Sequence, residues 1–181
     1  MDRLLSAEDG ILAQRAADGD ERAFAVLVRR HGPYLVAFAT RILRSRADAD
    51  DCVQEALIVA WRRLPELREP DRVRAWFSTI VARKATDRLR ARRPSTPIED
   101  AEPLSTLPSP DESALTSSQL DALRTVLDDL PAEQRTAWLL REVSGYSYDE
   151  IARELGISAT AVRGRLARAR ATVFERMQEW R

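Results

Sequence analysis

Residues 148–170 constrain the fold more than any other stretch, because their pattern predicts two helices joined by a glycine turn. Ser147 and Glu150 have the spacing of a capping box at a helix start. Gly156 follows where a helix prefers to end, since glycine adopts the left-handed conformation at little cost. Ser158 is a suitable N-cap for the next helix. The apolar face of the first helix consists of Ile151, Ala152 and Leu155.

The second helix of this pair is predicted to bury one stripe and to carry cations on the opposite face. The apolar stripe comprises Val162, Leu166, Ala169 and Val173. The residues expected to point away from it are Thr160, Arg163, Gly164, Ala167 and Arg168, flanked by Arg165 and Arg170. Arginines beside very small residues suit a helix in a DNA major groove, where the cations reach base edges. A solvated face of an ordinary helical hairpin is the alternative, but the cap, the turn and the arginines together favour DNA binding.

Composition indicates an all-α protein, since glycine is scarce, alanine and arginine abound, and no long stretch alternates with period two. The single Cys52 excludes an intramolecular disulfide and is expected to be a small packing residue in a reducing compartment. One cysteine and one histidine cannot form a usual structural zinc site, so we expect no metal and no cofactor. The first ten residues lack the apolar core of a secretion signal, and no run is long enough to span a membrane. We therefore expect a cytoplasmic protein.

The formal net charge of zero conceals basic ends and an acidic middle. Residues 1–93 carry 19 Lys and Arg against 14 Asp and Glu, whereas residues 94–129 carry 1 against 8. Five of the nine prolines fall within residues 94–114, which contain no aromatic residue. Such a segment cannot bury enough apolar area to fold. We therefore predict two helical domains, residues 1–93 and 115–181, joined by an acidic, extended linker at 94–114.

The start of the chain predicts helices whose breaks are marked by glycine and proline. Residues 8–43 are expected to form two helices broken near Gly19 and interrupted at Gly32-Pro33. His31 lies at the expected interruption, and we interpret it as a surface or capping histidine. Beyond residue 114, leucines predict one helix up to Leu130, and Pro131 suits the first position of the next.

Residues 45–64 have the pattern of a clean amphipathic helix. Its apolar face is expected to consist of Val53, Ala56, Leu57, Ala60, Trp61 and Leu64. Asp48, Asp50 and Asp51 suit its N-terminal end, where the helix dipole favours anions. The polar side carries Asp51, Gln54, Glu55 and Arg62. From their chemistry alone, simple solvation is the favoured interpretation of these residues.

Residues 65–72 predict a loop, and a second helix is expected from about Val73. Its apolar stripe comprises Val73, Trp76, Phe77, Ile80 and Val81. Cations then accumulate at Arg83, Lys84, Arg88, Arg90, Arg92 and Arg93, opposed only by Asp87. Cations that meet phosphates beside rings that stack on bases are typical of single-strand binding. The helical register places Trp76 and Phe77 in the core, so the cations carry the functional signal.

With these motifs in order, the chain resembles the extracytoplasmic-function group of bacterial sigma factors, the small two-domain members of the sigma-70 family. DADDCVQEALIVAWRRL resembles conserved region 2.2, and RVRAWFSTIVARKATDRLRARR resembles regions 2.3 and 2.4. LPAEQRTAWLLREVSGYSYDEIARELGIS and the arginine helix after it resemble region 4. The resemblance covers nearly the whole chain.

The resemblance implies partners and a role for each surface. Core RNA polymerase would be bound through its beta-prime clamp and its beta flap, with the clamp contacting Asp51, Gln54, Glu55 and Arg62. The −10 promoter element would be captured and opened by the loop at 65–72 and the helix after it, through Arg72, Arg74, Arg83, Lys84, Asp87 and Arg88. The −35 element would be read by Thr160, Arg163, Gly164, Arg165, Ala167 and Arg168, with Arg170 on phosphate. A separate anti-sigma factor is a further expected partner. The family has no catalytic residues of its own.

Four positions depart from the usual pattern of the family. Arg83 stands where related sequences often have an asparagine that handles an unpaired base. Thr160-Ala161 replaces a common Gly-Thr, and Gly164 replaces a common serine. These changes leave the resemblance intact but make the promoter sequence unpredictable.

Two other classes of function remain as alternatives. A free-standing helix-turn-helix regulator would explain residues 130–181 but gives no reason for the pattern at 45–93. A nucleic-acid enzyme is disfavoured, because the chain has no nucleotide-binding glycine loop, metal cluster or pairing of nucleophile and base.

Overall fold

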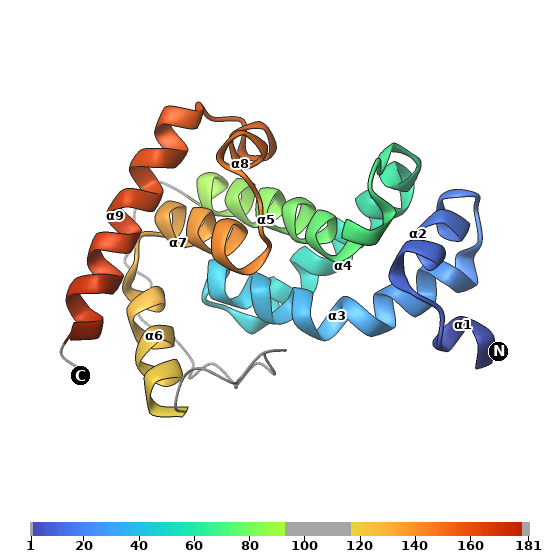
Figure 1. Ribbon diagram of the computed structural model, residues 1–181, viewed down its shortest axis with the longest axis horizontal. Coiled ribbons are helices and arrows are strands. Elements are labelled where there is room, and N and C mark those ends of the chain that lie inside the picture. Colours follow the sequence, from blue (N-terminus) through green and yellow to red (C-terminus); the bar gives the residue numbers. More distant parts are fainter. Residues whose placement is uncertain (1, 93–116, 179–181) are drawn as a thin grey trace. The chain divides into compact units, whose positions relative to one another are not determined.

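The computed structural model describes residues 2–92 and 117–178, and every regular element in these two ranges is helical (Figure 1). The predicted all-α fold is confirmed. The chain divides into two compact units, residues 1–93 and residues 94–181. The segment predicted to be a linker, residues 94–114, lies outside the described residues.

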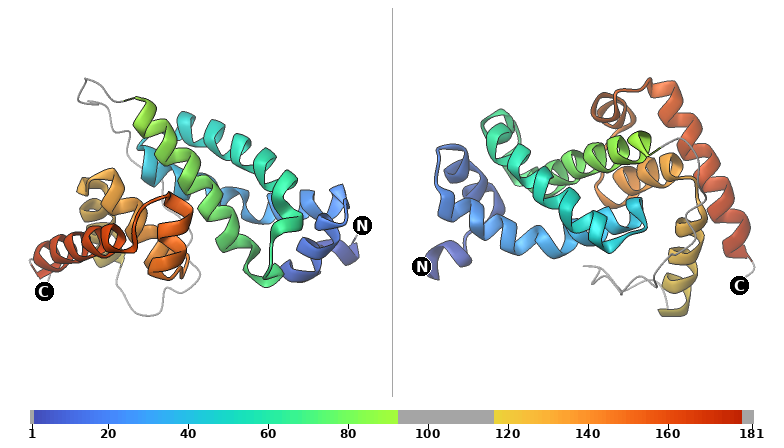
Figure 2. Two further views of the ribbon diagram at one scale, coloured as in Figure 1. Left: turned by 90° about the horizontal axis from the view of Figure 1, so that it is seen from above. Right: turned by 180° about the vertical axis from the view of Figure 1, so that it is seen from behind.

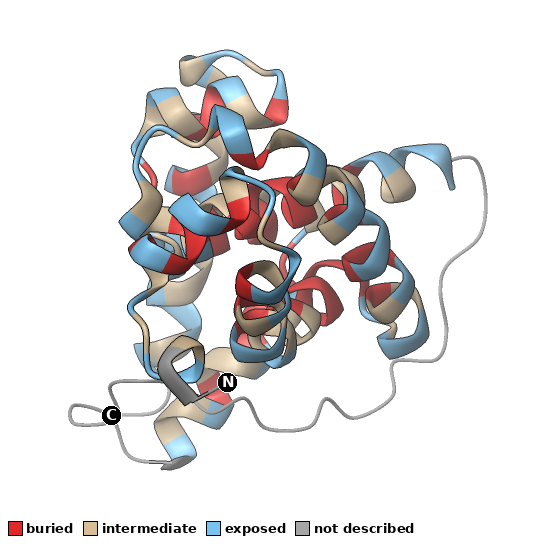
Figure 3. Ribbon diagram, turned by 90° about the vertical axis from the view of Figure 1, so that its right-hand side faces the viewer, coloured by how far each residue is buried: buried red, intermediate tan, exposed pale blue. Residues whose placement is uncertain are grey.

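Within residues 2–92, the first unit has five α-helices and two short 3-10 turns. Their bounds are α1 (Asp2–Leu5), α2 (Asp9–Ala17), α3 (Glu21–Leu43), α4 (Arg46–Arg63), η1 (Leu64–Glu66), η2 (Pro70–Arg72) and α5 (Val73–Ala91). Helices α3, α4 and α5 pack against one another, and α4 and α5 lie side by side in both views of Figure 2. Buried positions gather on their inward faces (Figure 3). Apolar side chains such as Leu35, Ile42 and Phe77 are almost completely removed from solvent there.

Helix α3 is continuous, so the interruption predicted at Gly32-Pro33 is wrong. A proline inside a helix removes one backbone hydrogen bond and typically costs about 3 kcal/mol. Packing offsets this cost, because the same helix face is buried on both sides of the proline. Its fully buried apolar residues include Leu27 before the proline and Leu35, Ala39 and Ile42 after it. The break near Gly19 is confirmed, since α2 ends at Ala17 and Gly19 has a positive φ of 94°.

The predicted surface or capping role of His31 is also wrong. Its ring is buried inside the first unit, and its Nε2 lies 2.8 Å from Asp9 Oδ2 of α2. Burial lowers the pKa of His31 below its usual 6.5, and the nearby Asp9 carboxylate partly opposes this shift. Arg30 also pairs with Asp9 and donates to the backbone oxygens of Leu5 and Ala7. Residues 30 and 31 therefore fix the first turn of α2 against α3.

The second unit is a set of short helices around the long C-terminal one. Their bounds are α6 (Ser117–Asp129), α7 (Ala132–Trp138), the π-helical turn η3 (Leu139–Val143), α8 (Tyr148–Leu155) and α9 (Ala159–Gln178). Pro131 was predicted to be the first residue of this helix, but it is the N-cap of α7, one residue before Ala132. Helices α6, α7 and α8 all pack against α9. One part of the resulting core joins Leu127 and Leu130 to Ala169 of α9.

The end of α6 is capped by a side chain from the next helix. Arg135 of α7 is 3% exposed, and its Nη1 donates to the carbonyl oxygens of Asp128 at 2.7 Å and Leu130 at 3.2 Å. A longer contact of 3.4 Å reaches Leu127 O. The last carbonyls of a helix have no partner within it, so the guanidinium satisfies them where water has no access.

Candidate nucleic-acid interface

The two helices predicted to read DNA, α8 and α9, are joined as expected from the sequence. The Ser147 hydroxyl accepts from Glu150 N, and the Glu150 carboxylate accepts from Ser147 N, which completes the capping box. Gly156 ends α8 in the left-handed conformation, with φ of 64°. Ser158 Oγ accepts from Ala161 N at 3.1 Å at the start of α9. These local bonds define the angle at which α9 leaves the turn.

Burial of one stripe of α9 exposes the opposite face. Val162, Leu166 and Ala169 have no exposed surface, whereas Val173 is only partly buried. The exposed residues of the outward face are Thr160, Arg163, Ala167 and Arg168, with Gly164 at intermediate exposure. These are the five residues predicted to point away from the core.

The cations on this outward face have polar or small neighbours. Arg163 Nη2 donates to Thr160 Oγ1 at 3.3 Å. The Arg168 guanidinium lies over Gly164, so that a Cβ added there would be 3.5 Å from Arg168 Nη1. No described carboxylate lies within ion-pair distance of Arg163 or Arg168. Their positive charge is therefore not neutralised by the described parts of the chain.

The two flanking arginines are placed differently. Arg165 has a side chain only 13% exposed, and its Nη2 lies 2.8 Å from Glu133 Oε2 of α7. Arg170 donates to Tyr148 OH at 3.0 Å and to Glu142 Oε1 at 2.8 Å. The Glu142 carboxylate, together with Tyr148, raises the pKa of Arg170. Both arginines thus hold α9 to neighbouring elements, a role that the sequence reasoning did not predict.

In the first unit, the predicted polymerase-binding residues form one exposed stripe along α4. These residues are Asp51, Gln54, Glu55 and Arg62. Ile58 lies in the middle of the stripe and is 55% exposed, although its side chain is large and apolar. The sequence reasoning missed Ile58, but the spacing of the stripe contains it at i+3 from Glu55. Single exposed apolar side chains are common on protein surfaces, so only the position of Ile58 within this stripe connects it to the predicted contact.

Ion pairs connect this stripe to the cations predicted to bind the −10 element. Glu55 Oε1 lies 2.6 Å from Arg88 Nη2, and Glu55 Oε2 lies 3.4 Å from Lys84 Nζ. Hydrogen bonds from Arg88 and Lys84 lower the pKa of Glu55. The two predicted surfaces of the first unit therefore meet at Glu55.

A second pair of the same kind lies two turns away along α4. Asp48 accepts from Arg92 at 2.9 Å and 2.5 Å, a two-pronged contact across the helix pair. The Arg92 hydrogen bond lowers the pKa of Asp48. Arg88 adds a hydrogen bond to the backbone oxygen of Asp48 at 3.1 Å. Neither ion pair was predicted from the sequence. The only sequence signal is that the acids on α4 are seven residues apart and the arginines on α5 are four apart, so each set lies on one side of its helix.

The other residues predicted for the −10 element are distributed along the start and the outer face of α5. Arg83 and Asp87 are exposed, and Asp87 lies 3.8 Å from Arg90. Arg72 lies 3.6 Å from Glu69. The Arg74 guanidinium stacks over the Tyr34 ring of α3, with 5.2 Å between its central carbon and the ring centroid. Tyr34 was not predicted, because its position beside Arg74 depends on how α3 and α5 pack.

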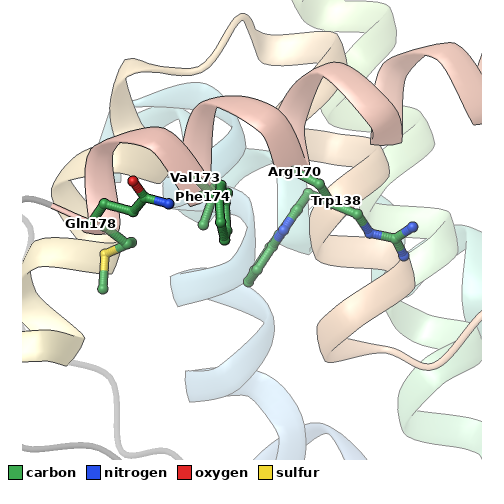
Figure 4. Close-up of a pocket in the computed structure, with 6 residues that line it drawn as sticks. Trp138, Arg170, Val173, Phe174 and Gln178 are labelled. Carbon is green, nitrogen blue, oxygen red and sulfur yellow. The ribbon is translucent and has the colours of Figure 1, made fainter. Parts of the chain in front are cut away.

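The second unit also has a hollow beside the C-terminal half of α9. Its volume is about 370 Å³, and Figure 4 shows the side chains around it. The lining residues are Trp138, Arg170, Val173, Phe174, Met177 and Gln178. Phe174 is 66% exposed, the largest exposure among the large apolar side chains of the described residues. The hollow is therefore mainly apolar, with one cation at its edge.

In the described parts of the chain, no helix has the length and apolarity needed to cross a membrane.

Comparison with known proteins identifies the family. Residues 27–94 match the model of Sigma-70 region 2, and residues 120–173 match the model of Sigma-70, region 4. The ECF RNA polymerase sigma factor SigM of Mycobacterium tuberculosis is 37% identical over 163 residues, which are 89% of this chain and 80% of that protein.

Two solved structures are similar over most of the chain. CnrH in complex with the cytosolic domain of CnrY is 33% identical, covers 94% of this chain and 97% of CnrH, and has a TM-score of 0.59. The sigma factor RpoE in complex with the anti-sigma factor NepR from Bartonella quintana is 26% identical, covers 86% and 96% of the two chains, and has a TM-score of 0.61. The chain therefore belongs to the extracytoplasmic-function group of the sigma-70 family of RNA polymerase sigma factors.

Proposed function

We propose that this chain binds core RNA polymerase in the cytoplasm and directs it to promoters by recognising a −10 and a −35 element. The observation that carries the proposal is the outward face of α9. Arg163 and Arg168 are exposed there with no carboxylate partner among the described residues, and Gly164 and Ala167 between them have no large side chain of their own. In a major groove, such arginines can donate two hydrogen bonds to a guanine.

The residues proposed for the −35 element form two groups: those that contact bases and those that position α9. We assign base contacts to Arg163 and Arg168, with Thr160, Gly164 and Ala167 at the groove. Arg165 and Arg170 set the position of α9 through Glu133 and Glu142. Arg170 retains an exposed side chain and is also assigned a phosphate contact.

We assign polymerase binding and −10 recognition to the first unit. The exposed stripe of α4, with Ile58 at its centre, would bind the beta-prime clamp through an apolar contact surrounded by charges. The loop at 65–72 and the exposed side of α5 would capture the opened −10 strand. The Tyr34–Arg74 stack, between α3 and the start of α5, offers a ring beside a cation, the combination that favours binding of single strands.

Two partners are assigned, one from the apolar hollow of the second unit and one from a similar sigma factor. We propose that it receives the beta flap of core polymerase, because Phe174 and Trp138 offer an apolar contact beside α9. We further propose that a separate anti-sigma factor binds this chain, as NepR binds the similar sigma factor RpoE. Neither assignment requires a cofactor or a catalytic residue.

Run-off transcription with core polymerase over a pool of genomic promoters tests the function. The expected result is transcription from a subset of promoters that share −10 and −35 sequences, and none from core polymerase alone. A palindromic footprint on DNA in the absence of polymerase, without promoter-directed transcription, would instead establish a free-standing regulator.

A further inference from the structure

The loop at 65–72, between α4 and α5, rests on a helix that has no assigned role. Its 3-10 turns η1 and η2 both pack against α2. The loop's own backbone bonds are local, with Leu67 N donating to Leu64 O and Arg72 N to Glu69 O. Glu66, Arg68 and Glu69 are exposed. The position of the loop therefore depends on the surface on which it lies.

Gly10, in the first turn of α2, lies directly against this loop. Gly10 is buried, and a Cβ added to it would lie 2.0 Å from Asp71 Oδ1 and 3.1 Å from Asp71 Cγ. Asp71 N would be 3.6 Å away, so the loop backbone also lies close. A Cβ at position 10 would overlap with the Asp71 carboxylate where it now lies, so that side chain would have to turn away. Glycine weakens a helix interior relative to alanine, and this contact supplies a packing reason for it.

The first turn of α2 cannot easily move aside, because α3 holds it. Asp9 precedes Gly10 and pairs with both Arg30 and His31 of α3. On the other side of α2, Leu12 and Ala16 are buried in the core of the first unit. A side chain at position 10 would therefore displace the Asp71 carboxylate from α2 rather than move the helix, and the loop would lose that contact.

We propose that Gly10 is a positioning residue, and that the first turn of α2 fixes the loop at 65–72 for recognition of the −10 element. This role rests on the proposed function of the loop. The contacts run from α3 through Asp9 to Gly10, and from Gly10 to Asp71 in the loop. The proposal gives α2 a part in promoter recognition without any contact to DNA.

The test uses the full chain with Gly10→Ala and a matched control, Gly32→Ala. Gly32 lies in α3, and a Cβ added to it meets nothing within 4 Å beyond its two chain neighbours. One of these neighbours is Pro33, which disfavours a helical residue with a Cβ before it, so a melting curve is recorded for each variant. Both changes add one methyl group to a helix of the same unit, but only one meets the loop. Two readouts are needed: hydrogen exchange of residues 65–72 in the free protein, and affinity of the reconstituted holoenzyme for the single-stranded −10 segment of a promoter chosen by run-off transcription.

Gly10→Ala should accelerate exchange in the loop and weaken binding of the −10 strand on the order of tenfold, the loss expected for one base contact. Gly32→Ala should change neither. Binding of a duplex that contains only the −35 element should remain unchanged in both variants. In Gly10→Ala/Asp71→Ala, which removes the overlapping carboxylate, most of the −10 affinity should return.

The possible outcomes distinguish failure of the role proposed for Gly10 from failure of the proposed promoter recognition. Equal loop exchange in Gly10→Ala and Gly32→Ala would overturn the packing role of Gly10, whatever the polymerase does. Faster loop exchange with unchanged −10 affinity would show that the loop is held by α2 but that its position does not matter for the promoter. Failure of the wild-type holoenzyme to bind the −10 strand would contradict the proposed function itself.

Discussion

Helices α5 and α9 both carry a row of cations, but the two rows are held differently. On α5, Lys84 and Arg88 pair with Glu55, and Arg92 pairs with Asp48, all across the interface with α4. On α9, the outward Arg163 and Arg168 have no described carboxylate partner. How much positive charge a basic helix can offer to DNA therefore depends on whether acidic residues of a neighbouring helix pair with it.

The difference predicts two kinds of DNA contact. A cation without an acidic partner can bind a base or phosphate at no cost in lost ion pairs. A cation already paired must exchange one carboxylate for a phosphate, so its net gain is smaller. The same pairing makes Glu55 part of two surfaces, because it contacts the −10 cations and lies in the α4 stripe.

The largest effect is expected from reversing the charge at Glu55. Glu55→Arg should weaken binding of core polymerase by about 2–5 kcal/mol, the loss that follows when one member of a buried charged pair is removed from an interface. It also places a third cation beside Lys84 and Arg88. These side chains are partly exposed in the free protein, so the free energy of unfolding should fall by less than about 1 kcal/mol.

The matched control for this prediction is Asp50→Arg, which makes the same charge change on α4 at about 140° around the helix from Glu55. Asp50 pairs with Arg46 four residues earlier, and both side chains are exposed. Polymerase affinity and a melting curve should be measured for both variants. Equal affinities in two folded variants would remove the reason for placing polymerase on the α4 stripe.

The next largest effect concerns the unpaired arginines of α9. Arg163→Ala or Arg168→Ala should each weaken promoter binding by about 1–3 kcal/mol and relax the preference at one base pair of the −35 element. Stability should not change, because neither side chain is buried or paired with an acid in the part of the chain that the structure describes. The measurement is holoenzyme affinity for duplexes in which each −35 position is varied. Uniform losses on every sequence would contradict the assignment of base contacts.

Replacing the paired arginine on the same helix should give a different result. Arg165→Ala leaves Glu133 without its partner and removes a mostly buried side chain, so unfolding should become easier by about 1 kcal/mol. Its effect on −35 affinity should be the same for all sequences. A base-specific loss with unchanged stability would place Arg165 in the groove instead.

Arg170→Ala should also weaken binding to all sequences alike and reduce the salt dependence of binding, as expected for a phosphate contact.

The smallest effect is a dependence of stability on pH that belongs to the paired acids of the first unit. Arg92 holds the pKa of Asp48 below its usual value of 3.8 in the folded chain. The stabilisation by this pair is therefore complete well above pH 3.8 and is lost as the pH falls through the lower, folded pKa. The wild type should be more stable than Asp48→Asn at about pH 6, and the difference should shrink towards about pH 3. Melting curves over this range check the sign.

Local signals in the sequence were sufficient to predict the helix-turn-helix. The capping box of Ser147 and Glu150 and the left-handed Gly156 depend on residues that are neighbours in the chain. The residues on the outward face of α9 could also be predicted from the helical period, because burying the apolar stripe leaves the opposite side of the helix exposed. The exposed stripe of α4 was predictable for the same reason.

Tertiary contacts could not be predicted in this way. The partners of Glu55 lie 29 and 33 residues away, and Arg165 lies 32 residues from Glu133. No spacing rule predicts such pairs before the packing of the helices is known. Packing also explains the wrong prediction at Pro33, where burial on both sides outweighs a strong local signal, and it places His31 in the core beside Asp9.

The cap that Arg135 provides has a consequence for how the second unit unfolds. The final carbonyls of α6 are satisfied by a side chain from α7, so α6 cannot lose its last turn gradually, as the end of an exposed helix does. Opening that end requires the guanidinium to withdraw, and withdrawal disturbs the helix that carries it. We expect α6 and α7 to open as one cooperative segment, with matching rates of amide exchange. Lysine at position 135 could not maintain this coupling, since a single ammonium group cannot reproduce the planar geometry of a guanidinium.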